Sequence, residues 1–97
     1  MNVEQQARIF KAVGDPTRIR ILRLLPAKPV CREMYNVSEL VAEVGGSQAN
    51  ISRHLHILKE AGLVRCRKAC ANVYYWREGE AFERIRRTLK LFAGRRP

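Results

Sequence analysis

The sequence predicts a mostly helical α+β domain, with about five helices and one two-stranded β-hairpin within residues 1–97. Three observations predict this fold class. Apolar residues recur every three to four positions in several segments, as they do on one face of a helix. Two short helices joined by a Gly-containing turn are expected at residues 36–62. Two β-type runs with only a short loop between them come directly afterwards.

The first helix is expected over about the first dozen residues, and Gly14 ends it. Asp15 then serves as N-cap of a second helix, with Pro16 at the first helical position, where a missing N–H costs nothing. The apolar face of this helix comprises Ile19, Ile21, Leu22, Leu24 and Leu25. A connector of residues 26–36 follows, with one short extended piece around residues 34–35.

The next two helices are marked by their capping residues. Asn36 and Glu39 form an N-cap and capping box for a short helix. Ser47 caps a longer helix, which Gly62 closes. Because the second helix carries polar side chains suited to base edges, the pair is interpreted as a helix-turn-helix. The alternative is an ordinary helical hairpin with a solvated polar face.

After Gly62 the sequence has the character of a β-hairpin, with runs at residues 63–68 and 72–76. Its tip is expected to carry Arg65, Arg67 and Lys68. A basic hairpin directly after a helix-turn-helix is a wing, which can lie along the phosphate backbone or in the minor groove. The aromatic residues at positions 74–76 are expected to pack in the core rather than to stack on bases.

A last helix is expected from Gly79 to about Ala93, and residues 95–97 are expected to form a frayed tail. The helix has a narrow apolar stripe of Phe82, Ile85, Leu89 and Phe92. We expect this stripe to pair with its mate across a two-fold axis, and the first helix, with Phe10, to join the interface. Packing on its own domain is the alternative.

The chain is strongly basic: it has 19 Lys and Arg against 9 acidic residues, a net charge of +10 and a pI near 10.4. A small basic domain predicts a polyanionic partner, most often nucleic acid, whereas a membrane surface is disfavoured because the basic residues are spread through a patterned globular sequence. No apolar run approaches the ~20 residues of a transmembrane helix, and no export signal is visible. We therefore expect a cytoplasmic protein with reduced thiols.

Five segments resemble the ArsR/SmtB family of winged-helix repressors. They are residues 10–25 (FKAVGDPTRIRILRLL), 47–48 (SQ), 51–55 (ISRHL), 58–63 (LKEAGL) and 73–75 (VYY), in the order that the family has them. The resemblance covers nearly the whole chain. It implies a winged helix-turn-helix, a homodimer built from the first and last helices, and a palindromic operator. It also implies an inducer, often a metal or metalloid ion, that releases the DNA.

The chain departs from the family at its familiar sensing sites. The metalloid box of the family is a Cys-x-Cys pair, and the corresponding positions here are Asn36 and Ser38. The other frequent site uses Asp and His residues on the final helix, but this sequence has no His after His56. Neither site can be carried over.

We therefore expect a single-domain, homodimeric, sequence-specific DNA-binding repressor. Gln and Asn can pair with adenine and Arg with guanine, so the candidate base contacts are Ser47, Gln48, Asn50 and Arg53. The candidate phosphate contacts are Ser52, His54, Arg65, Arg67 and Lys68. For His54, core packing is the alternative, and a role as a metal ligand is disfavoured. A winged-helix adaptor for proteins is the rival class, which the basic wing disfavours. An enzyme is not expected, because no nucleophile–base pairing, phosphate-binding loop or acidic pair is recognisable.

No cofactor is required by this interpretation, but the three cysteines leave several alternatives for an inducer. Cys31, Cys66 and Cys70 would suit trigonal coordination of arsenite or another thiophilic ion. Cys66 and Cys70 would instead form a disulfide if the hairpin brought their Cα atoms within ~7 Å. The third alternative is that the cysteines have no sensing function, since Cys66 suits a small buried position.

Overall fold

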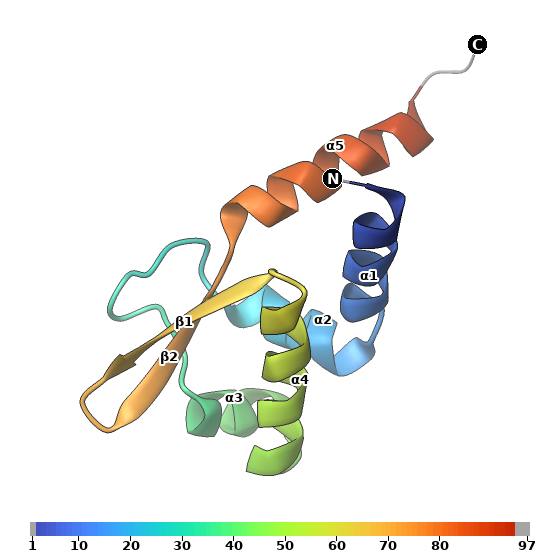
Figure 1. The fold of residues 1–97 in the computed structure, drawn as a ribbon. Helices are drawn as coiled ribbons and strands as arrows, with labels where there is room; N and C mark the ends of the chain where they lie inside the picture. The colour runs from blue at the N-terminus through green and yellow to red at the C-terminus, as the bar shows by residue number, and fades with distance from the viewer. Residues whose placement is uncertain (1, 95–97) are drawn as a thin grey trace.

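The computed structural model describes residues 2–94, and its elements lie close to the predicted bounds (Figure 1). They are α1 (Val3–Val13), α2 (Pro16–Leu24), α3 (Val37–Val44), α4 (Gln48–Glu60), β1 (Val64–Ala69), β2 (Asn72–Arg77) and α5 (Gly79–Ala93). Five helices and one antiparallel hairpin in this range confirm the predicted fold class. The tail predicted for residues 95–97 lies outside the described residues.

The predicted capping residues begin the helices. The Asp15 carboxylate accepts hydrogen bonds from two backbone N–H groups of α2. Asn36 and Glu39 complete a reciprocal capping box at α3, with bonds of 2.8 and 2.9 Å. The Ser47 hydroxyl accepts from the Asn50 N–H at the start of α4. These bonds satisfy donors that each first turn leaves free, which is why the boundaries follow from local sequence.

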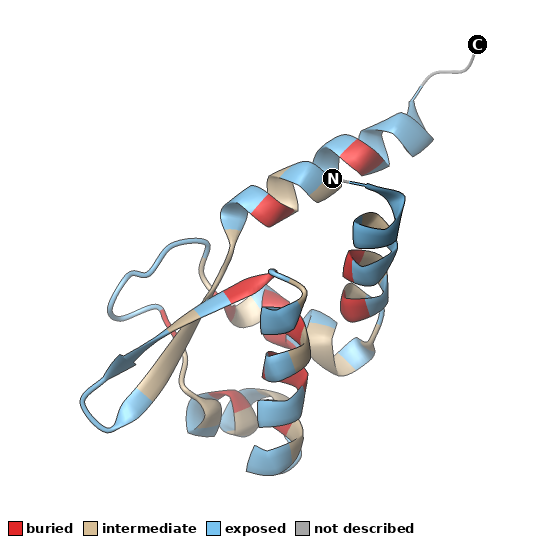
Figure 2. Cartoon of the chain, in the orientation of Figure 1, coloured by how far each residue is buried: buried red, intermediate tan, exposed pale blue. Residues whose placement is uncertain are grey.

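The hydrophobic core lies where α1, α2, α3 and α4 meet the start of the hairpin (Figure 2). Its largest fully buried side chains are Ile21, Leu25, Leu40, Ile51, Leu55, Leu58 and Leu63. Ile19 is 42% exposed, so the predicted apolar face of α2 was too broad. The core side of a nine-residue helix is set by Ile21 and Leu22, and Ile19 lies off that side.

The hairpin has two different faces, because side chains alternate along each strand. Val64, Cys66 and Tyr75, the partner of Cys66, lie on one face, and Tyr75 packs against the core. Tyr35 pairs with Tyr75 in an isolated antiparallel bridge, so the extended piece predicted in the connector joins the wing. Tyr74 and Trp76 lie on the opposite face and are outside the core cluster, so core packing was wrong for these two aromatics.

Different elements form the two ends of the molecule (Figure 1). The N-terminal part of α4 and the tip of the hairpin lie toward one end, and α5 together with the start of α1 lies toward the other. Among residues 2–94, no helix has the length and apolar character that crossing a bilayer requires.

Candidate nucleic-acid interface

The first turns of α4 present a polar surface to solvent. The turn before them requires two positive φ angles, +93° at Gly45 and +88° at Gly46, which glycine adopts without steric cost. The four predicted base contacts, and Ser52 among the predicted phosphate contacts, follow directly on this surface. The side chains of Ser47, Gln48, Ser52 and Arg53 are exposed and that of Asn50 is partly exposed. The structure thus brings these five predicted residues together on one helix end.

Hydrogen bonds hold two of these side chains in place. The Gln48 amide donates to the Ser38 hydroxyl at 2.8 Å, which ties the start of α4 to α3. The Arg53 guanidinium donates to the Asn50 amide oxygen, also at 2.8 Å. Both bonds are exposed, so they restrict rotamers but leave the remaining donors and acceptors free for a ligand.

His54 points the other way and is 8% exposed. Its Nδ1 accepts a hydrogen bond of 3.1 Å from Arg18 Nε, and lies 4.0 Å from the Asp15 carboxylate. Of the two roles expected for His54, the structure supports packing, because the ring faces α2 instead of solvent.

Sequence reasoning missed Arg18, which organises this junction. Its guanidinium donates to the Ala12 carbonyl at 3.0 Å and to the Lys11 carbonyl at 3.3 Å, as well as to His54. One side chain therefore connects the last turn of α1 with α2 and α4. The 36-residue separation of Arg18 and His54 left no local pattern from which this contact was predictable.

Asp15 contributes a pH-dependent part of the stability. The hydrogen bond from the Arg18 backbone, above all, lowers the pKa of Asp15 below its ordinary value, and burial opposes it. A carboxyl group with a lowered pKa stabilises the fold at higher pH, and this contribution is lost as pH falls through the folded-state pKa. As the pH is lowered below about 4, we expect the unfolding free energy of Asp15→Asn to fall less than that of the parent. Urea denaturation at several pH values measures this, and equal losses would contradict it.

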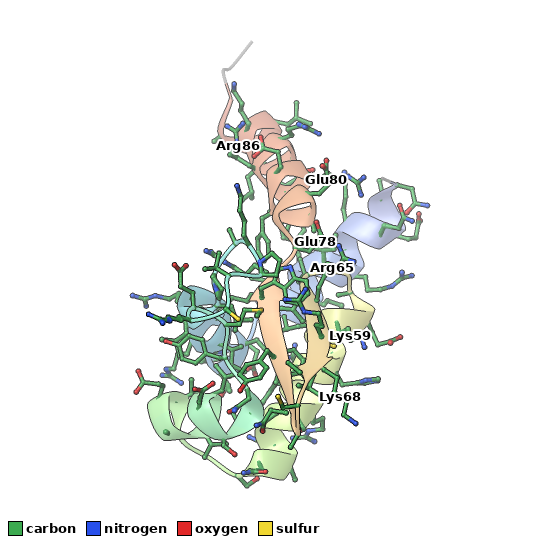
Figure 3. The ribbon with its side chains drawn as sticks, turned by 90° about the vertical axis from the view of Figure 1, so that its left-hand side faces the viewer. Lys59, Arg65, Lys68, Glu78, Glu80 and Arg86 are labelled. Carbon is green, nitrogen blue, oxygen red and sulfur yellow. The ribbon has the colours of Figure 1, made fainter. Side chains whose placement is uncertain are left out.

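The outer face of the wing combines basic and aromatic side chains. Arg65 and Arg67 both lie over the Trp76 ring, at 5.9 and 5.8 Å from its centroid, within the range of cation–π contact. Arg65 is also 3.5 Å from Glu78. Figure 3 shows Arg65 beside Glu78 at the base of the wing and Lys68 farther toward its tip. The prediction that Arg65 lies at the tip was therefore wrong, since Arg65 pairs with Trp76 near the open end of the hairpin.

The three cysteines do not come together within one protomer. Cys31 is exposed in the connector, Cys66 is half-buried on β1, and Cys70 is exposed in the turn with φ of +56°. From Cys66 to Ala69 the chain is extended, at ~3.3 Å a residue, which already exceeds the ~7 Å that a disulfide spans before the turn with Cys70 begins. Among residues 2–94, no three His, Cys, Asp or Glu side chains are close enough to hold a metal ion. The trigonal site and the disulfide predicted for these thiols therefore do not fit the fold.

The terminal helices leave an apolar surface open. Phe82 and Ile85 pack against the core of their own protomer, as the alternative for this stripe expected. Phe10 is partly buried and lies beside Ile85. In contrast, Leu89 is 48% and Phe92 is 73% exposed. Within the predicted stripe, the two residues on the last turns of α5 therefore have little contact with their own protomer.

Comparison with known proteins identifies this arrangement. Residues 15–65, which span the helix-turn-helix and the start of the wing, match the family model described as "Bacterial regulatory protein, arsR family". An uncharacterized HTH-type transcriptional regulator of Methanocaldococcus jannaschii is 41% identical over 90 residues, 91% of each chain. A transcriptional repressor of Synechocystis, an SmtB homolog, is 35% identical over 72 residues, 74% of this chain and 51% of that protein.

A solved structure agrees with these sequence relationships. The homodimeric winged helix-turn-helix DNA-binding domain of a possible ArsR-family regulator from Mycobacterium bovis superposes with a TM-score of 0.72 at 28% identity. The alignment covers 94% of this chain and 80% of that one. The family consists of regulators, which confirms the expectation that the chain is not an enzyme. The chain belongs to the ArsR family and is a winged helix-turn-helix, DNA-binding transcriptional regulator.

Proposed function

We propose that the chain is a cytoplasmic repressor that acts as a homodimer on a palindromic operator. In this proposal the first turns of α4 enter the major groove and the wing follows the phosphate backbone. The last turns of α5, with α1, join the two protomers. The observation that carries the proposal is the exposed surface of Ser47, Gln48, Ser52 and Arg53, at the end of the molecule opposite α5.

Charge and surface composition support this arrangement. The net charge of +10 suits a polyanion, and Arg67 and Lys68 extend the basic surface from α4 along the wing. Leu89 and Phe92 form an apolar surface at the other end, where a second copy would cover them. The M. bovis domain is homodimeric, which favours the same assembly here.

Gln48→Ala tests whether α4 reads bases. We expect it to relax the preference at one position in each half-site, because an amide that pairs with adenine discriminates by ~1–3 kcal/mol. Arg67→Ala is the matched comparison: loss of a phosphate contact should weaken operator and random DNA alike and reduce the salt slope by about 1. Fluorescence anisotropy on operator, single-base variants and random duplex measures both. Equal losses on all duplexes with Gln48→Ala would refute the groove assignment.

Thiol-dependent release from DNA is a second candidate function, and the position of Cys66 favours it. Cys66 is half-buried and lines a cavity of about 460 Å³ between the end of α4 and the wing, together with Lys59, Arg65 and Glu78. A group attached to this thiol would contact both DNA-binding elements. Cys31 and Cys70 are exposed away from such a junction. Release would therefore depend on a single thiol instead of on an ion held by three.

Cysteine variants test this second function. Iodoacetamide treatment is expected to weaken operator binding by the parent and by the Cys31→Ser/Cys70→Ser variant, but not by Cys66→Ser. Arsenite without oxidant is expected to have little effect, because no second thiol lies nearby. Anisotropy before and after treatment gives the affinities, with the triple Ser variant as control. Full sensitivity of Cys66→Ser, or none in the parent, would exclude release through Cys66.

A further inference from the structure

A cleft between the end of α2, the connector and the base of the wing brings three arginines together. It has a volume of about 600 Å³, and Arg23, Arg32 and Arg77 all line it. They come from α2, the connector and the last position of β2, so only the folded chain assembles them. We call this cavity the connector cleft. A pocket of this volume is in the range that holds a small organic molecule.

Arg77 is the residue that points most clearly to a ligand. Its backbone N–H donates to the Pro26 carbonyl at 2.8 Å, which fixes the strand end beside α2. Its side-chain Nε is buried but has no hydrogen-bond partner. A buried donor on a charged group costs free energy when it lacks an acceptor, and a planar guanidinium favours carboxylate or phosphate oxygens.

Two acidic residues also line the cleft, but they leave the arginines in excess. The Glu39 carboxylate accepts the Asn36 N–H at 2.9 Å as part of the α3 capping box, so one of its oxygens is already engaged. Glu33 is exposed in the connector. Three guanidinium groups therefore face two carboxylates, and the cleft favours an anion.

The rest of the wall is apolar. Leu25 and Met34 are 1% and 7% exposed, and Leu24 and the ring of Tyr35 complete this side. An occupant that places an apolar or aromatic body here and an anionic group at the arginines matches both parts of the wall. An inorganic anion would match only the arginines and would leave the apolar part of the wall without a partner.

We propose that the connector cleft binds a small organic anion, with its carboxylate or phosphate group on Arg77, Arg23 and Arg32. Its apolar body lies against Leu24 and Met34. The elements whose residues line the cleft, the end of α2, the connector and β2, lie away from the last turns of α5 (Figure 1). A second copy that covers those turns therefore leaves the cleft accessible.

A ligand bound in the cleft would affect the DNA-binding surface through Tyr35. The Tyr75 N–H donates to the Tyr35 carbonyl at 2.9 Å, which links the wing to the residue before the α3 N-cap. An anion held between Tyr35 and Arg77 would thus contact both the segment leading to α3 and the end of β2. This coupling between the cleft and DNA binding rests on the proposed function. We expect an anion bound in the cleft to change operator affinity by about 5- to 150-fold, the usual range of coupling between sites.

Calorimetric titration with three probes tests the site without DNA. Benzoate and phenyl phosphate carry the two anionic groups on one aromatic body, and neutral benzamide is the control. We expect at least one anion to bind with a dissociation constant of about 1 mM or lower, and benzamide not to bind detectably. Which anion binds more tightly distinguishes a carboxylate ligand from a phosphate ligand. Inorganic phosphate should bind more weakly than phenyl phosphate.

Variants locate the binding. Arg77→Gln and Arg32→Gln are expected to weaken the anion at least about tenfold, and Arg20→Gln, on α2 but outside the cleft, to leave it unchanged. Arg32 is exposed in the connector, so its variant keeps the test valid if Arg77→Gln unfolds. Equal weakening by Arg20→Gln, or binding of neither anion, would overturn the proposal. Anion binding without any operator binding would instead leave the site standing and refute the proposed function.

Discussion

Replacing Leu89 by aspartate is expected to convert the proposed dimer into a folded monomer. Leu89 is 48% exposed in the protomer, beside Phe92 on the last turns of α5. The hydrophobic core of the protomer therefore does not depend on Leu89. In the proposed dimer the same position is buried, where an unpaired carboxylate costs several kcal/mol. With only one α4 per complex, operator affinity should fall by about 10²–10⁴-fold. Sedimentation equilibrium at micromolar concentration, with anisotropy on the operator, measures both effects.

Lys90→Asp is the matched control for Leu89→Asp. Lys90 is exposed and, about 100° around α5 from Leu89, lies outside the apolar stripe, so the same new side chain should leave the dimer intact. Circular dichroism establishes whether Leu89→Asp keeps its helices. An unfolded variant would mean that the monomer is not stable alone, and a stable dimer would refute the interface at the end of α5.

A fourfold rise in salt concentration is expected to weaken DNA binding at least as strongly as Leu89→Asp does. A dimer that makes roughly 6–10 phosphate contacts should lose ~10³–10⁵-fold in affinity between about 50 and 200 mM salt. The basic wing and the net charge of +10 are the physical reasons, because each neutralised phosphate releases counterions. Anisotropy titrations at four salt concentrations give the slope. A slope near zero would contradict the proposed phosphate contacts.

The boundaries of the elements were predictable because short-range bonds set them. Asp15, Asn36 and Ser47 each cap the helix that follows within three residues, and glycine breaks the chain between α3 and α4. Two β-type runs with a short loop between them likewise predicted the hairpin. Such signals require no knowledge of what lies elsewhere in the chain.

The candidate site was predictable only in part, because long-range contacts decide where a side chain points. The exposed side chains of Gln48 and Arg53 follow from helical spacing, but the burial of His54 depends on Arg18 from another helix. The placement of Arg65 over Trp76 depends on strand register. The separation of the three thiols was likewise not predictable from the sequence, because it depends on where the fold places the connector and the wing.

Selection of bound sequences from random duplex DNA tests the central claim most directly. If two α4 helices of one dimer read the duplex, the enriched sites should be near-palindromes with half-site centres about one helical turn, ~34 Å, apart. The bound complex should contain two protomers per site, and Gln48→Ala should lose the preference at a symmetric pair of positions. No enriched sequence, or a single unrepeated half-site occupied by one protomer, would contradict a dimeric, sequence-reading regulator.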